Sequence, residues 1–171
     1  MQIVRRGVIL VGHGGIPKDC PSELVAQFKR LEAKRRSERS PISAEERDLD
    51  VQIRRWPRTR ENDPYQAGLE AVGAALRPLL EGTFLTLAYN EFCTPTVEES
   101  VEDLIRQGAT HIIVTTTMFT PGGAHSELEI PEILQGMRAR HPNVAIEYAW
   151  PFDPSTIADI LHRQVRRFMS R

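Results

Sequence analysis

The 171-residue sequence has few of the features that mark several large classes of protein. Its two cysteines, Cys20 and Cys93, are too few and too far apart for a disulfide scaffold or a Cys-x-x-Cys metal site, and a cytoplasmic location is expected. No apolar run approaches the ~20 residues of a membrane-spanning helix, and no signal-peptide layout is present, so we expect no membrane partner. The net charge of −1 provides no basic footprint for nucleic acid.

Motifs of several common enzyme classes are also missing. The sequence contains no Gly-x-x-x-x-Gly-Lys-[Ser/Thr] P-loop, no Gly-x-Gly-x-x-Gly dinucleotide fingerprint and no His-Glu-x-x-His zinc motif. The segment His13-Gly14-Gly15 is similar to the oxyanion glycines of α/β hydrolases, but no Gly-x-Ser-x-Gly nucleophile elbow accompanies it. These absences argue against a nucleotide-dependent enzyme, a permanent zinc enzyme and a serine hydrolase.

Four short apolar runs are present, and each stops at glycine, asparagine or proline, which is typical of strands buried on both faces. They span residues 8–11, 83–89, 111–119 and 144–150. Between them the helical period recurs after Asp63-Pro64, Thr94-Pro95 and Asp153-Pro154, each of which has the pattern of an N-cap followed by proline. Alternating strands and helices predict a three-layer α/β fold with a four-stranded parallel sheet and helices on both faces.

The stretch 21–62 interrupts this rhythm after the first strand. It carries charges of both signs and two helical faces, one with Leu24 and Phe28 and the other with Leu49 and Ile53, and Ser43 opens the second with a capping-box pattern. We expect a charged helical insertion in a single domain of residues 1–171. Its role is open between a solvated surface excursion and a lid or partner surface.

Ligands of open parallel sheets bind beyond the carboxyl ends of the strands. The predicted strands deliver His13, Glu91 and His125 to that edge, each from a different strand. Histidine is a common metal ligand and a base near neutral pH, and a carboxylate partly removed from water can also accept protons. Three such donors on separate loops favour a site that meets a metal transiently. The alternatives are loop histidines bonded to backbone and a glutamate that is exposed or caps the next helix.

Other titratable residues have weaker patterns. Glu127 and Glu129 follow His125 closely and either assist it or favour the N-terminus of the helix that includes Pro131. The remaining histidines are interpreted as structural or surface residues, namely His111, His141 and His162.

The motifs at these positions resemble those of a known family. Gly12-His13-Gly14 follows the first strand, and Phe119 to Pro131 fits the pattern Phe-x-x-x-Gly-x-His-x-x-x-x-[Ile/Leu]-Pro. Together with residues 7–14, 89–99 and 108–114, in this order, they resemble the sirohydrochlorin chelatase family, the class II chelatases of cobalamin and siroheme biosynthesis. The resemblance covers the whole chain except 21–62, and it implies a chelatase-like (flavodoxin-like) fold.

Membership would imply insertion of Co²⁺ or Fe²⁺ into a sirohydrochlorin-type tetrapyrrole without ATP, and no cofactor beyond this divalent metal. The family's two metal-handling histidines fall on His13 and His125, and an acidic residue at the end of the second strand falls on Glu91. Residues beside them become candidates for binding the tetrapyrrole: Gly14, Gly15, Asn90, Thr120, Pro121, Gly122 and Gly123. A chain with one copy of the unit resembles the short CbiX-type form, which implies a homodimer.

Two departures from the family are visible. Gly15 stands where members often have serine, which should matter little. The insertion is the larger departure, and its arginines are candidate contacts for a substrate rich in carboxylates: Arg54, Arg55, Arg58 and Arg60. A tetrapyrrole chelatase is therefore the leading hypothesis. A non-catalytic tetrapyrrole- or metal-binding protein is the second, and a histidine-dependent hydrolase or phosphatase is the third.

Overall fold

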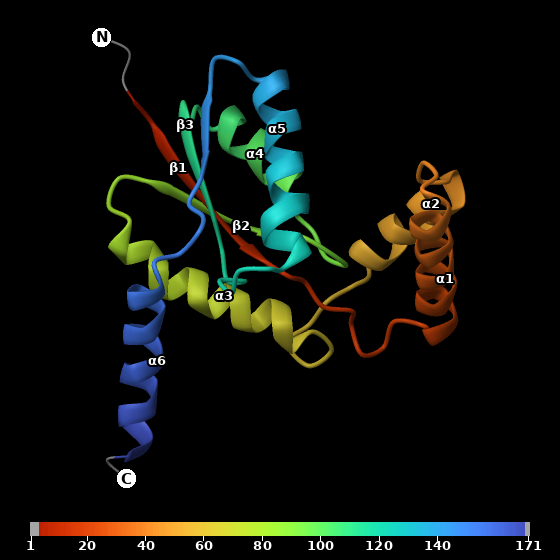
Figure 1. The fold of residues 1–171 in the computed structure, drawn as a ribbon, viewed down its shortest axis with the longest axis horizontal. Coiled ribbons are helices and arrows are strands. Elements are labelled where there is room, and N and C mark those ends of the chain that lie inside the picture. Colours follow the sequence, from red (N-terminus) through yellow and green to blue (C-terminus); the bar gives the residue numbers. More distant parts are fainter. Residues whose placement is uncertain (1–3, 170–171) are drawn as a thin grey trace.

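A computed structural model describes residues 4–169 of the protein (Figure 1). Four parallel strands form one sheet in the order β2-β1-β3-β4. Their bounds are β1 (Arg6–Gly12), β2 (Phe84–Tyr89), β3 (His111–Thr116) and β4 (Ala145–Tyr148). In the register, Gly12 lies beside Tyr89 and Val11 lies beside Thr116. The first three strands therefore end together, and the segments that follow them leave from one edge.

Helices cover both faces of the sheet, as the sequence predicted (Figure 1). On one face lie α4 (Val97–Arg106) and α5 (Ile130–Arg140), and on the other lies α3 (Pro64–Leu76), which continues into the short 3₁₀ turn η1 (Arg77–Leu79). Successive side chains of a strand point to opposite faces, so β1 contributes Ile9 and Val11 to one core and Val8 and Leu10 to the other. This is why its sequence is apolar without alternation.

The helix starts follow from local capping, with one correction. Asp63 caps α3 through a hydrogen bond from Gln66 N, with Pro64 in the first turn, as predicted. The prediction that Thr94-Pro95 opens α4 is wrong, because the helix begins at Val97 and Thr96 is its cap. Thr96 and Glu99 form a reciprocal capping box, which satisfies two backbone N–H groups and outweighs the proline signal two residues earlier.

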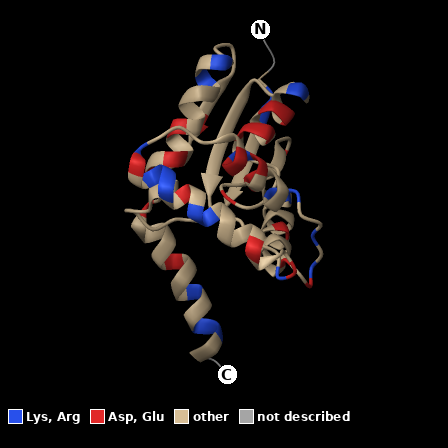
Figure 2. Cartoon of the chain, turned by 90° about the vertical axis from the view of Figure 1, so that its right-hand side faces the viewer, with Lys and Arg blue, Asp and Glu red and all other residues tan. Residues whose placement is uncertain are grey.

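The insertion is a helical hairpin of α1 (Ser22–Glu38) and α2 (Ala44–Arg54), set apart from the sheet in Figure 1. It has a small apolar core of its own, formed by Cys20, Phe28, Leu49 and Ile53. Figure 2 shows acidic and basic residues interspersed over the helices, in agreement with the balanced charge. Ser43 caps α2, but the carboxylate of Glu46 turns to Arg35 of α1 (2.8 Å), so it joins the two helices.

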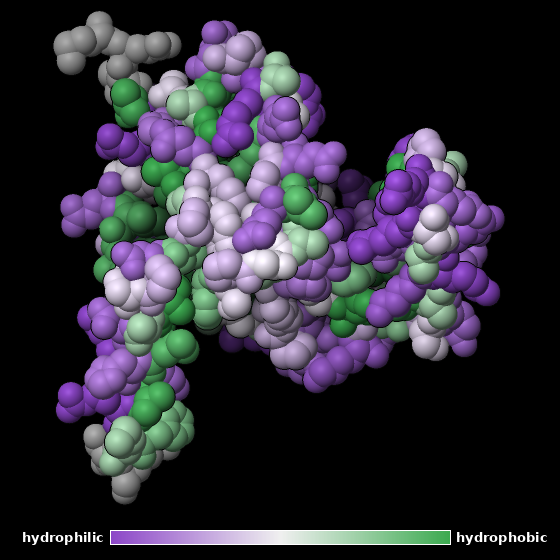
Figure 3. Space-filling view, viewed as in Figure 1, coloured by the Kyte–Doolittle hydropathy of each residue, from purple (hydrophilic) through white to green (hydrophobic). Residues whose placement is uncertain are grey.

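The last helix, α6 (Pro154–Met169), extends away from the body of the molecule (Figure 1). None of its residues is buried, and its apolar side chains Ile160, Leu161 and Val165 are 53–59% exposed. Figure 3 shows hydrophobic surface along this helix. Within residues 4–169, no helix combines the length and the apolar character that a bilayer span requires.

Candidate metal and tetrapyrrole site

Three predicted residues meet at the carboxyl edge of the sheet. His13 directly follows β1, Glu91 lies in the loop after β2, and His125 opens the π-turn η2 (His125–Glu129), which leads into α5. One side-chain donor atom from each lies within 4.8 Å of the other two, and all three side chains are partly exposed. The prediction that these three residues meet at one edge of the sheet therefore agrees with their observed geometry.

The ring of His13 is oriented by its own backbone. Its Nδ1 lies 2.9 Å from the carbonyl oxygen of Gly14, so the proton belongs on Nδ1 and the lone pair remains on Nε2. That Nε2 faces Glu91, 3.7 Å from Oε2. The ring also lies edge-on to the ring of His125, with centroids 4.8 Å apart.

His125 is oriented by a carboxylate. Its Nδ1 lies 2.8 Å from Oε2 of Glu129, and Asn90 Nδ2 donates to the same oxygen, also at 2.8 Å. Asn90 Nδ2 and His125 Nδ1 also lie 2.9 Å apart, but both are donors to this one oxygen, so this contact is not a hydrogen bond between them. Ile130 N bonds back to His125 O, five residues away, and this π-turn brings the side chains of His125 and Glu129 to one side. The Nε2 lone pair of His125 is thus left for a ligand.

The carboxyl of Glu129 is held in its charged form. Partial burial opposes ionisation, but the hydrogen bonds from His125 and Asn90 outweigh it, so the pKa of Glu129 lies below its ordinary value. A charged partner at Nδ1 fixes the tautomer and the orientation of the ring. The site therefore presents two imidazole Nε2 atoms and one carboxylate oxygen, a donor set that suits Fe²⁺ or Co²⁺ and leaves positions open for another ligand.

The candidate tetrapyrrole-binding residues are divided between two environments. Gly14 and Gly15 lie beside His13, while Asn90 is buried and supports Glu129. Residues 120–123, by contrast, form an exposed turn after β3. Gly122 N in this turn donates to Glu127 Oε1 at 2.9 Å, which gives Glu127 a role in closing the turn.

The remaining histidines lie away from the site. His111 begins β3 at the opposite edge of the sheet and pairs with Glu147, at 3.1 Å. His141 follows α5 and contacts Glu102 at 2.9 Å. His162 is exposed on α6, so all three fit the structural or surface interpretation.

Two contacts of His13 were not anticipated from the sequence. The backbone N–H of His13 donates to the hydroxyl of Tyr65 in the first turn of α3, at 2.6 Å, and the ring of Phe92 lies 6.2 Å from the imidazole between centroids. Phe92 in turn contacts Phe28 of α1. Phe92 falls within the motif 89–99, but Tyr65 lies outside every motif, and only the crossover that places the start of α3 under the end of β1 brings Tyr65 here.

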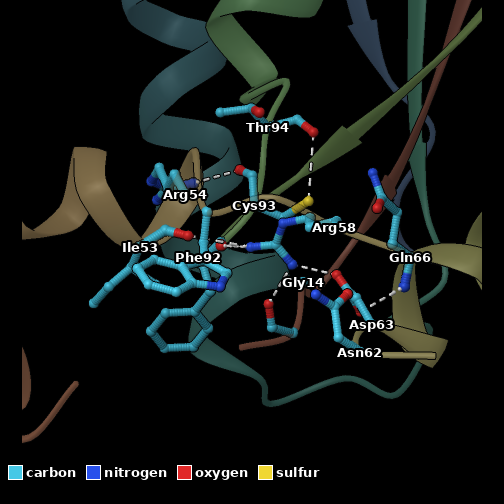
Figure 4. A network of polar contacts seen from close by, with 12 residues as sticks. Gly14, Ile53, Arg54, Arg58, Asn62, Asp63, Gln66, Phe92, Cys93 and Thr94 are labelled. Atoms are coloured by element: carbon cyan, nitrogen blue, oxygen red, sulfur yellow. Dashed lines mark hydrogen bonds and ion pairs between the residues drawn. The ribbon is translucent and has the colours of Figure 1, made fainter. Parts of the chain in front are cut away.

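The arginines of the insertion differ from the expectation. Arg58 is buried in an ion pair with Asp63 (Figure 4). Arg54 pairs with Asp50 at 2.8 Å and donates to the backbone carbonyls of Asn90 and Cys93. Arg58 is therefore not available to substrate, because its guanidinium is buried in contacts within the protein, whereas Arg54 remains partly exposed and stays a predicted contact. Arg55 and Arg60 are exposed.

A cleft of about 330 Å³ separates the hairpin from the donor residues. Its walls combine apolar side chains of both parts with the carboxylates of Glu91 and Glu129 and the guanidinium of Arg36 on α1. Figure 3 shows a hollow between the hairpin and the body of the molecule. Of the three candidate donors, Glu91 thus adjoins a space that a ligand can enter.

Comparison with known families decides the affiliation of this chain. Residues 59–168 match the model of the family described as CbiX. The chain belongs to the CbiX family. The match covers His125 and Glu91 and starts after the hairpin, so His13 is placed in the site by the geometry of β1 rather than by the family model.

Two curated relatives are similar to parts of this CbiX-family chain. It is 36% identical over 89 residues to the sirohydrochlorin ferrochelatase of Priestia megaterium, covering 52% of this chain and 31% of that protein. It is 33% identical over 79 residues to the sirohydrochlorin ferrochelatase of Bacillus subtilis (strain 168), covering 45% and 30%. The chain therefore matches less than a third of the length of either relative.

A solved structure supports the fold. The sirohydrochlorin chelatase SirB from Bacillus subtilis subspecies spizizenii, in complex with cobalt, superposes with a TM-score of 0.53 at 21% identity. The similarity covers 95% of this chain and 51% of that one. The three-layer architecture is thus shared with that structure.

Proposed function

We propose that residues 1–171 form one chelatase-like domain that inserts a divalent metal, Co²⁺ or Fe²⁺, into a sirohydrochlorin-type tetrapyrrole. The observation that carries this proposal is the convergence of His13, Glu91 and His125, with both Nε2 lone pairs left for a ligand. Membership of the CbiX family and the similarity to proteins named sirohydrochlorin ferrochelatase support it.

The donor set fits the chemistry of metal insertion. The ion is a substrate, so it has to be held loosely enough to be passed on, and a partly open set of three donors suits that better than a closed tetrahedral site. As the ion passes to the nitrogens of the macrocycle, the Nε2 lone pairs are released. Two pyrrole N–H bonds break in the reaction, and the freed imidazoles and the Glu91 carboxylate are placed to accept the two protons.

The macrocycle is proposed to enter beside the donors, with Gly14, Gly15 and the exposed turn 120–123 as contacts. A Cβ at Gly122 would meet no atom within 4 Å, so a flat ring can approach the backbone of this turn closely. Asn90 acts indirectly in this scheme, through its hydrogen bond to Glu129. No further cofactor and no ATP are required, because the ring nitrogens bind the metal as the donors release it.

The test is a spectroscopic insertion assay that contains only protein, sirohydrochlorin and Co²⁺ or Fe²⁺. Wild-type protein should accelerate the absorption change above the metal-only background, and the variant His13→Ala, His125→Ala should not. The variant His162→Ala, which changes an exposed histidine on α6, serves as a control and should retain the wild-type rate. Equal rates for wild type and the double variant would refute the chelatase function, and binding of the tetrapyrrole without accelerated insertion would favour the non-catalytic alternative.

We also propose that the chain forms a homodimer through α6. Its apolar positions Ile160, Leu161 and Val165 follow the helical period and are more than half exposed in a single chain. A two-fold partner that presents the same stripe would cover them. Leu161→Lys should convert a dimer to a monomer in sedimentation velocity, and a wild-type chain that is monomeric at high concentration would contradict the proposal.

The location of the protein in the cytoplasm remains a proposal from the sequence. Cys20 and Cys93 are both buried free thiols, which is compatible with a reducing compartment. Fractionation of the source cells tests it directly.

A further inference from the structure

The first residues of the loop that carries Glu91 are hydrogen-bonded to the backbone at the end of β1. Asn90 N donates to Gly12 O at 2.9 Å, and Glu91 N donates to His13 O at 2.8 Å, so the pairing of β1 and β2 continues beyond the strands. Phe92 then takes a left-handed backbone conformation, with φ of 57°, which turns the chain away from the sheet. After this turn the loop returns to the end of β2, where Tyr89 N donates to Pro95 O at 2.9 Å.

The hairpin contacts the same loop through Arg54, on the side away from β1. Arg54, the last residue of α2, donates from Nη1 to Cys93 O and from Nη2 to Asn90 O, both at 3.1 Å. The same guanidinium is held by Asp50 one helical turn earlier. The Arg54 guanidinium therefore binds the Glu91 loop at Asn90 and at Cys93, and Figure 4 shows the bond to Cys93.

Arg58 connects this loop to the other side of the site. Its guanidinium donates to Phe92 O, directly after Glu91, and to Gly15 O, two residues after His13, at 2.8 Å. Its charge is balanced by Asp63, and both side chains are buried, 7% and 2% exposed. Asp63 also caps α3, the helix whose Tyr65 holds the backbone of His13. Arg58 thus joins the segments of two of the three donors to a common support (Figure 4).

We propose that Arg54 and Arg58 are positioning residues, through which the inserted hairpin sets the distance between His13 and Glu91 and so the affinity of the site for the metal. This inference rests on the proposed function. Neither arginine reaches the donor atoms, and both act through backbone carbonyls on either side of them. On this view the hairpin is a fixed support of the site and not a solvated excursion.

Lysine can replace the charge of these arginines but not their geometry. A guanidinium presents several N–H groups in a fixed plane, whereas an ammonium is a single point, so it cannot hold two carbonyls and a carboxylate together. Arg58→Lys would leave Asp63 buried with an imperfect partner and can unfold the chain. Arg54→Lys is the safer variant, because Asp50 is 25% exposed and tolerates the change.

The experiment measures binding of Co²⁺ alone to the full chain, by titration of its visible absorption, together with the melting temperature. Loss of groups that orient metal ligands weakens metal binding by about 10- to 100-fold, and we expect Arg54→Lys to fall in this range. The matched control is Arg35→Lys, because Arg35 pairs with Glu46 inside the hairpin and, within residues 4–169, makes no hydrogen bond to either loop. It should bind Co²⁺ within about twofold of wild type.

The outcomes separate the two proposals. Wild-type affinity in Arg54→Lys would overturn the positioning role while leaving the chelatase function intact. Equal weakening by Arg54→Lys and Arg35→Lys, in proportion to lost melting temperature, would also overturn it, because the effect would then be one of stability. A wild-type chain that binds no Co²⁺ would overturn both proposals.

Discussion

Replacement of Gly14 by alanine should damage the site more than the fold. A Cβ at this position would lie 1.8 Å from the carbonyl oxygen of Glu91, and Gly14 has a φ of +99°. The left-handed conformation costs an alanine about 1–2 kcal/mol. Relief of the clash requires a shift of about 1.5 Å between the loops of His13 and Glu91, and overpacking of this kind adds about 1–3 kcal/mol.

The matched control is Gly82→Ala. Gly82 also has a positive φ, of +66°, but a Cβ there would meet no atom within 4 Å. We expect urea unfolding to show a loss of about 1–2 kcal/mol for Gly82→Ala and about 2–5 kcal/mol for Gly14→Ala. A misplacement of about 1 Å can lower a rate by about 100-fold, so metal insertion should fall strongly in Gly14→Ala only. If both variants lose the same stability and keep the same insertion rate, the close approach of Gly14 to Glu91 has no role.

Three further predictions concern single side chains. Burial raises the pKa of Cys93 to about 11, so iodoacetamide at pH 8 should label it slowly in the native protein and readily in urea; rapid native labelling would contradict its burial. Because the pKa of Glu129 is lowered in the folded state, its charged carboxylate stabilises the fold above pH ~5, and this stabilisation should disappear as the pH falls through that pKa. The urea midpoint of wild type should therefore exceed that of Glu129→Gln at neutral pH, and the two midpoints should converge in acid; midpoints that diverge in acid would contradict the prediction. Leu104→Ala should lose about 2–5 kcal/mol in urea unfolding, and exposed Leu79→Ala less than about 0.5.

The edge of the sheet that carries the site could be predicted because parallel strands impose it. Apolar runs that end in glycine or asparagine mark the strand ends, and the register of β1, β2 and β3 brings those ends together. His13, Glu91 and His125 needed no more information than this. Residue types that bind metals were then sufficient to name the donors.

The contacts that support the donors could not be predicted in the same way. Arg54 and Arg58 bind backbone carbonyls, and a carbonyl oxygen has no signature in the sequence. Their charges therefore suggested an anionic ligand. The start of α4 was misplaced for a related reason, since Thr94-Pro95 and Thr96 both have the composition of a cap and only the reciprocal bond of Glu99 distinguishes them.

The hairpin leaves the body of the protein and returns to it at one point, because Lys18 N donates to Asn62 O at 2.9 Å. An excursion whose ends meet adds no crossing connection, so the order of the four strands does not depend on it. During evolution such a segment can be lengthened, shortened or exchanged without rebuilding the core. Each exchange would nevertheless alter the hydrogen-bond donors that the insertion presents to the backbone of residues 90–93. Selection can therefore adjust the metal site through the insertion, without changing the metal-binding residues themselves.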